Sequence, residues 1–143
     1  MDKKIFILWL LTIFFWGITP IVEKIGLKNV SSLTGLFIRT FFSLAGLSIA
    51  VLIFESASFK TLTSRDLLFF ALSGTLGGFL GMLTYFALLK TQTASQIVPL
   101  TATYPLVTTI FSILILKEEI TFSKILGTVF VIIGIFLLLR SSS

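Results

Sequence analysis

The chain has 143 residues, of which 56% are hydrophobic and only 12% are charged, and its formal net charge is +5. Because soluble domains usually carry about 25% charged residues, the chain has too little polar surface for a water-soluble protein and no room for a separate soluble domain. It contains no cysteine and no histidine, which excludes disulfides, thiol nucleophiles, Ser-His-Asp triads and the usual zinc sites. We therefore expect a membrane protein that is not an enzyme, with no cofactor and no metal.

Apolar runs follow one another along the whole chain, at about 5–25, 33–54, 67–89, 96–116 and 124–139. A helix needs about 20 residues to cross the hydrocarbon core. In lipid these runs should be helical, because their backbone polar groups must be satisfied internally. They predict an all-α integral membrane fold: one domain over 1–143 that forms a bundle of five transmembrane helices. Thr63 and Asp66 have the spacing of a helix start before the third run.

The basic residues stand singly between the apolar runs, where they can meet lipid headgroups. The expected partner is therefore the lipid bilayer and not nucleic acid. Five crossings place the chain ends on opposite sides, and the N-terminal side is slightly richer in positive charge: Lys3, Lys4, Lys60, Arg65, Lys117 and Lys124 against Lys24, Lys28, Lys90 and Arg140, with Arg39 near that second side. The positive-inside rule predicts a multi-pass protein of the cell's inner (plasma) membrane with a cytoplasmic N-terminus. The small bias leaves insertion in both orientations open as a hypothesis.

The first run contains Trp16, Pro20 and Lys24 at four-residue spacing. Pro20 removes one backbone hydrogen bond and should kink the helix. The three residues share nearly one face, which could be a stripe that faces substrate. The alternative is a buried aromatic residue together with a lysine that extends to the headgroups.

Arg39 is a charge roughly two turns into the second run. An arginine at the centre of a membrane helix costs about 2.5–3.5 kcal/mol on insertion scales, and such residues normally face a polar cavity or a partner. We consider this role for Arg39 beside simple extension to the headgroups. In the third run, Gly77 and Gly81 continue a four-residue spacing of small residues that starts at Ser73. They predict either tight helix packing or a flexible helix that lines a cavity, into which Tyr85 could place its hydroxyl.

The fourth run has two prolines, Pro99 and Pro105, which we interpret as hinge positions together with Pro20, Gly77 and Gly81. Thr101, Tyr104 and Thr108 fall on one face of this run. In lipid such a polar stripe should face the bundle interior or water, and its hydroxyls could bond to the backbone or to a bound molecule. We predict that the stripe lines a transport pathway.

Glu118 follows the fourth run, beside Lys117 and Lys124, and is interpreted as a structural member of an interfacial charge cluster. Gly127 and Gly134 lie near one face of the fifth run. Small residues there predict close packing against another helix, in the same chain or in a second copy.

Together these features resemble the EamA-like family of the drug/metabolite transporter superfamily over nearly the full chain. The resemblance rests on Trp16-Gly17 with Pro20 and Lys24, on Arg39, on the run 85–91, on the run 94–105 followed by Glu118, and on Thr121 leading to Gly127 and Gly134. It implies a fold of ten helices in two inverted five-helix repeats around a central cavity, of which this chain looks like one half. It also implies export of amino acids, metabolites or drugs.

The chain is also similar to the four-helix small multidrug resistance proteins, whose first helix carries an essential glutamate eight residues before a lysine. When Lys24 is matched to that lysine, Trp16 occupies the glutamate position and Glu23 is not at the matching place. This departure argues against the proton/drug exchange of that family here.

We therefore predict a transporter, an exporter of a small metabolite, amino acid or amphipathic compound, that works by alternating access as a homodimer, in an antiparallel or a parallel arrangement. Arg39 or Lys24 could hold an anionic group of the substrate. A lipid-carrier flippase subunit and a non-transporting membrane scaffold remain the alternatives. The expected substrate-binding residues are Trp16, Lys24, Arg39, Tyr85, Thr101, Tyr104 and Thr108.

Overall fold

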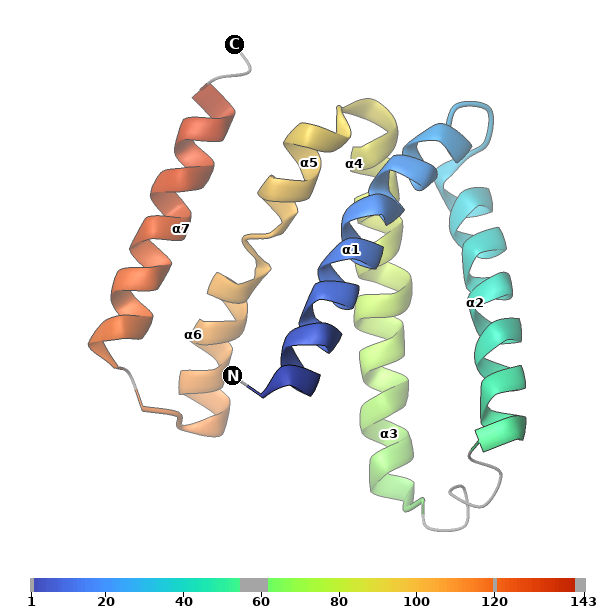
Figure 1. Cartoon of the computed structure of the whole chain (residues 1–143), viewed down its shortest axis with the longest axis horizontal. Coiled ribbons are helices and arrows are strands. Elements are labelled where there is room, and N and C mark those ends of the chain that lie inside the picture. The colour runs from blue at the N-terminus through green and yellow to red at the C-terminus, as the bar shows by residue number, and fades with distance from the viewer. Residues whose placement is uncertain (1, 55–61, 120, 141–143) are drawn as a thin grey trace. The chain divides into compact units, whose positions relative to one another are not determined.

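The computed structural model describes residues 2–54, 62–119 and 121–140. Lys60 and the side chain of Arg140, which enter the predicted charge bias, lie outside this part. The described backbone consists of helices joined by short turns, without a strand (Figure 1), which confirms the all-α prediction. The chain divides into two compact units, Met1–Thr91 and Gln92–Ser143.

In the described residues, four helical stretches are long and apolar enough to cross a membrane: Lys3–Gly26, Ser32–Phe54, Ser64–Thr91 and Ala94–Leu116. They coincide with the first four predicted runs to within a few residues at each end. A further apolar helix, Phe122–Leu137, is shorter. The helix lengths thus support a multi-pass membrane protein.

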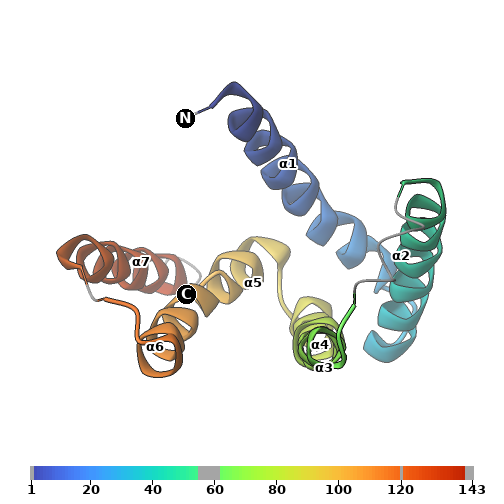
Figure 2. The ribbon, with the colours of Figure 1, turned by 90° about the horizontal axis from the view of Figure 1, so that it is seen from below.

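The first unit contains α1 (Lys3–Gly26), α2 (Ser32–Phe54) and a third, composite helix. The composite helix joins α3 (Ser64–Ser73), the π-helical segment Gly74–Gly81 and α4 (Met82–Thr91). Figure 2 shows α3 and α4 end-on, one behind the other, as parts of one rod. Figure 1 shows α1 changing direction toward its C-terminal end, and the helix continues past Pro20.

The composite helix starts where the sequence predicts. The Asp66 N–H donates to the Thr63 hydroxyl oxygen at 3.2 Å, and the Thr63 N–H donates to the Asp66 carboxylate at 3.1 Å. This reciprocal pair is a capping box, which satisfies two backbone donors at the helix start.

The core of the first unit lies where the C-terminal end of α1, the start of α2 and the end of α4 meet. Leu27, Leu36, Phe86 and Leu89 are buried there. Gly35 makes this close approach possible, because a Cβ at that position would lie 2.9 Å from Leu27 Cδ2 and 3.4 Å from Phe86 Cε1. The opposite ends of α1 and α2 expose nearly all of their apolar side chains, as expected for helices whose solvent is lipid.

The second unit contains α5 (Ala94–Thr101), α6 (Tyr104–Leu116) and α7 (Phe122–Arg140), with α7 packed against α5. The predicted fourth run is therefore one candidate span made of two helices that part at residues 102–103. Pro105, in the first turn of α6, has no N–H to bond the carbonyl four residues earlier, which accounts for the break. α6 ends at Leu116, and its C-cap residue, Lys117, adopts the left-handed conformation with φ 56°.

Candidate functional site

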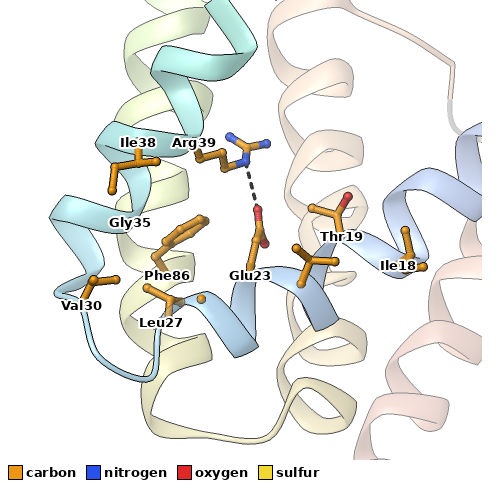
Figure 3. A pocket seen from close by; sticks show the side chains of 11 residues that line it. Ile18, Thr19, Glu23, Leu27, Val30, Gly35, Ile38, Arg39 and Phe86 are labelled. Carbon is orange, nitrogen blue, oxygen red and sulfur yellow. Dashed lines mark ion pairs between the residues drawn. The ribbon is translucent and has the colours of Figure 1, made fainter.

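An apolar pocket of about 470 Å³ lies in the first unit, between α1, α2 and α4. Figure 3 shows its walls, to which α1 and α2 contribute most side chains and α4 contributes Phe86. The residues that line it are Ile18, Thr19, Val22, Glu23, Gly26, Leu27, Val30, Gly35, Ile38, Arg39 and Phe86. A pocket of this volume falls within the range of small-molecule sites, about 300–1,000 Å³.

One ion pair joins two walls of the pocket. Arg39 Nε on α2 lies 3.0 Å from Glu23 Oε1 on α1, and the Glu23 side chain is only 9% exposed whereas the Arg39 side chain is 40% exposed. Figure 3 shows the guanidinium with its Nε turned to Glu23 and its two terminal nitrogens turned away from it. Tyr85, half-buried on α4, lies near both members of the pair.

Two lysines brace the same end of the unit from opposite sides. Lys24 Nζ donates to the Leu89 carbonyl oxygen at 2.6 Å and to the Lys90 carbonyl oxygen at 3.2 Å, at the end of α4. Lys90 Nζ donates to the Val30 carbonyl oxygen at 2.6 Å, in the turn between α1 and α2. The last carbonyls of a helix lack partners within the helix, and a cation there also meets the negative end of the helix dipole. The lysines therefore hold α1, the turn and α4 together.

Comparison with known proteins identifies the family of the chain. The model of the EamA-like transporter family matches residues 3–140. The chain belongs to this family. An uncharacterized protein of Methanocaldococcus jannaschii is 34% identical over 139 residues, which cover 96% of this chain and 97% of that protein.

Two relatives are named as transporters. An uncharacterized transporter of a Sinorhizobium species is 30% identical over 132 residues, covering 90% of this chain and 92% of the relative. An uncharacterized transporter of Archaeoglobus fulgidus is 28% identical over 127 residues, covering 88% of this chain but 45% of the relative. No solved structure matches the chain. The comparisons therefore support a membrane transporter of the EamA-like family.

The substrate-binding residues predicted for the first unit do not all gather at the pocket. Arg39 lines it, and Lys24 and Tyr85 lie near it on the elements that form it. Trp16 is 69% exposed and does not line the pocket, while Pro20 is buried. The three-residue stripe on α1 is thus divided, because Lys24 bonds to α4 and Trp16 points to the exterior of the unit.

Gly77 and Gly81 both lie in the π-helical segment of the composite helix. Nothing in the described chain comes within 4 Å of a Cβ built at Gly77, and a Cβ at Gly81 would meet only the Leu76 carbonyl oxygen of the same segment, at 3.1 Å. The small face therefore contacts no neighbouring helix within the first unit. π-Helical turns are rare and frequently lie at functional sites, so the predicted hinge role of this segment stays a prediction.

In the second unit the predicted polar stripe is satisfied by its own backbone. The Thr101 hydroxyl donates to the Ile97 carbonyl oxygen at 2.9 Å, and the Thr108 hydroxyl donates to the Tyr104 carbonyl oxygen at 3.2 Å. The Tyr104 side chain is exposed. Of the two alternatives for these hydroxyls, the structure shows the bond to the backbone, and the pathway-lining role stays a prediction.

The structural residues of the second unit take several positions. Pro99 lies inside α5 and Pro105 at the start of α6, on either side of the break. Glu118 Oε2 lies 3.4 Å from Lys124 Nζ, and the structural role expected for Glu118 stays a prediction. Gly127 and Gly134 have nothing within 4 Å of a built Cβ in the described chain, and their role in packing against another helix stays a prediction.

Sequence reasoning missed Glu23 as a site residue. The signal that could have found it is the spacing of charges: Glu23 is an acidic residue within the first apolar helix, and Arg39 is a cation at comparable depth in the next, antiparallel one. Two opposite charges in adjacent membrane helices normally pair. The contacts of Gly35 with Leu27 and Phe86 carried no comparable signal, because a single glycine does not reveal which side chains will approach it.

Proposed function

We propose that this chain is an exporter of a small metabolite, amino acid or amphipathic compound that works by alternating access as a dimer. The observation that carries the proposal is the Glu23–Arg39 ion pair on the wall of an apolar pocket, within helices long enough to span a membrane. Charged residues in membrane helices are expensive, and they generally mark substrate or ion pathways. A structural scaffold would gain nothing from an open pocket beside such a pair.

The lengths of the relatives support a transporter that is built from two five-helix repeats. Two relatives are covered almost completely by a chain of this size, whereas the match covers 45% of the Archaeoglobus transporter. A segment of this size therefore makes up most of two relatives and about half of the Archaeoglobus transporter. A homodimer, in an antiparallel or a parallel arrangement, would supply the second five-helix repeat, with Gly127 and Gly134 at the contact.

In the proposed five-helix repeat, α7 makes the fifth crossing of the membrane. This helix has 19 residues, and at about 1.5 Å per residue it reaches nearly the ~30 Å of the hydrocarbon core. An odd number of crossings puts the two chain ends on opposite sides. Reporters fused to the C-terminus, each active on one side of the membrane, test this: signals from both would support dual insertion, and a signal from one side alone would exclude an antiparallel homodimer.

Transport itself is tested by comparing the small molecules that cells release. Cells that make the chain should accumulate at least one compound in the medium faster than cells that make an Arg39→Gln variant at the same membrane level. Arg65→Gln is the matched control, because Arg65 lies at the far end of the composite helix and contacts Phe69. Identical release profiles for all three chains would contradict a transporter and favour a scaffold, and an altered lipid distribution alone would favour a flippase subunit.

A further inference from the structure

We propose that the Glu23–Arg39 pocket binds a small organic anion with an apolar body, and that Glu23 takes up one proton when the anion binds. This inference deepens the proposed function and rests on it. The pocket supplies both parts of the recognition: the guanidinium for the anionic group, and walls such as Ile18, Val22 and Ile38 for the apolar body.

The open donors of Arg39 face the right way for an anion. A guanidinium has five N–H donors in a rigid fork, and Glu23 Oε1 lies 3.0 Å from the Nε atom in an ion pair without hydrogen-bond geometry. The two terminal nitrogens point away from Glu23 in Figure 3, and they can hold a carboxylate or phosphate through two parallel hydrogen bonds. Glu23 thereby fixes the orientation of the group that meets the ligand.

The exposure of the two side chains favours an anion over a cation. Within the described chain, the Glu23 side chain is 9% exposed and the Arg39 side chain is 40% exposed. A ligand therefore reaches the guanidinium more readily than the carboxylate, and a cationic ligand would compete with Arg39 for Glu23. An anionic ligand can reach Arg39 while the ion pair remains in place.

Charge balance then requires a proton. The ion pair is neutral, so an arriving monoanion would leave one net negative charge in an apolar pocket, where an unbalanced charge is strongly disfavoured. A proton from the aqueous phase that binds Glu23 restores neutrality, and Arg39 then serves the ligand alone. Anion and proton would consequently bind, and move, together.

Among the described residues, no cation other than Arg39 is placed to provide this balance. The charged group that faces Glu23 from α2 is Arg39, and the titratable group near it on α4 is the phenol of Tyr85, which is uncharged near neutral pH. Lys24 follows Glu23 on α1, but its ammonium bonds to the Leu89 and Lys90 carbonyl oxygens. Protonation of Glu23 is the change in charge that this set of groups allows most readily.

Calorimetry on the purified full chain tests the proposal with defined probes. Benzoate and hexanoate should bind near neutral pH, whereas the uncharged benzamide and the cation benzylammonium should not. Titration in two buffers of different ionisation enthalpy should show uptake of about one proton for each benzoate bound. Arg39→Gln should weaken benzoate binding by about tenfold or more, since it removes the charge-assisted fork.

Variants separate the two roles. Glu23→Gln should still bind benzoate but without proton uptake, and Arg65→Gln should behave as the wild type. Because Arg39→Gln leaves a buried carboxylate unpaired and could impair folding, the double variant Glu23→Gln/Arg39→Gln keeps the pocket neutral and should also fail to bind benzoate.

Several results would overturn the inference: binding of benzylammonium in place of benzoate, unchanged benzoate binding in Arg39→Gln, benzoate binding without proton uptake in the wild type, or no binding of either carboxylate above that of benzamide. If these occur while cells still export a compound in an Arg39-dependent way, the substrate class is wrong and the transporter function stands. If export is also absent, both fail.

Discussion

The two units differ in the groups that join their helices, although threonine hydroxyls bond to their own helix in both units. In the first unit, Lys24, Lys90 and Arg39 each reach an acceptor on another element, at 2.6–3.2 Å. In the second, the hydroxyls of Thr101 and Thr108 bond to carbonyls of their own helical segments, three or four residues earlier. Long charged side chains thus tie helices together here, while short hydroxyls tie each helix to itself.

This contrast indicates where changes should have distant effects. Removing a group that joins two helices of the first unit should weaken the packing of α1, α2 and α4. Removing a hydroxyl that bonds within α5 or α6 should change little beyond that turn. Three substitutions test this contrast and a fourth tests the end of α6. Unfolding in mixed detergent micelles, followed by circular dichroism, measures each of them.

Phe86→Ala should have the largest effect. Phe86 is 2% exposed and contacts the Gly35 region of α2, so its truncation leaves a cavity at the junction of the first unit. We expect a loss of about 2–4 kcal/mol in the free energy of unfolding. This is somewhat less than in soluble cores, because lipid, unlike water, is a good solvent for the exposed ring. Phe42→Ala is the control on α2, where the ring is 69% exposed, and it should change the unfolding free energy little. Equal losses for the two variants would show that the junction is not a packed core.

Lys24→Met should cost about 1–2 kcal/mol, because it keeps the length of the side chain but removes the donors to the Leu89 and Lys90 carbonyl oxygens. Lys28→Met, at an exposed lysine in the following turn, should be nearly neutral. A Lys24 variant as stable as the Lys28 variant would mean that the lysine brace contributes nothing, and the contrast between the units would lose its main support.

The sequence was sufficient to predict the helices, because long apolar runs have a single solution in lipid. The capping box at Thr63 and Asp66 was equally readable, since both partners lie within one turn. The position of the break in the fourth run was less predictable. Two prolines marked this run, but only the structure places the interruption at residues 102–103.

The candidate site was only partly predictable. Arg39 was found because a charge in an apolar helix needs a partner, yet the partner, Glu23, depends on the relative rotation of α1 and α2, which helical periodicity does not fix. For the same reason Lys24 was assigned to substrate although it bonds to the end of α4. Trp16 shares a face with Lys24 by spacing, but it points outward, and no pattern within one helix states which neighbour covers that face.

Lys117→Gly should stabilise the chain by about 0.5–1 kcal/mol, because Lys117 adopts φ 56°, a conformation that glycine takes without the clash of a Cβ. Lys117→Ala removes the same charge but keeps the Cβ, and should give no gain. The comparison of the two variants isolates the backbone term. A similar gain from both would instead assign the effect to the charge at the end of α6.

Thr108→Val should have the smallest effect on stability, below about 0.5 kcal/mol, because it removes one hydroxyl whose bond goes to the Tyr104 carbonyl oxygen of its own helix. Its value lies in a second measurement, the release of the compound exported by the wild type. In the wild type, the Thr108 hydroxyl donates to the backbone and can still accept a hydrogen bond from a passing substrate. If the stripe lines the pathway as the sequence predicts, the loss of this acceptor should lower export although stability is nearly unchanged. Thr12→Val on α1 is the matched control, because the Thr12 hydroxyl bonds in the same way to the Leu8 carbonyl oxygen and was not assigned to the pathway. Unchanged export in both variants would mean that the hydroxyls of α6 serve only their own backbone, and that the pathway depends on the charged junction of the first unit.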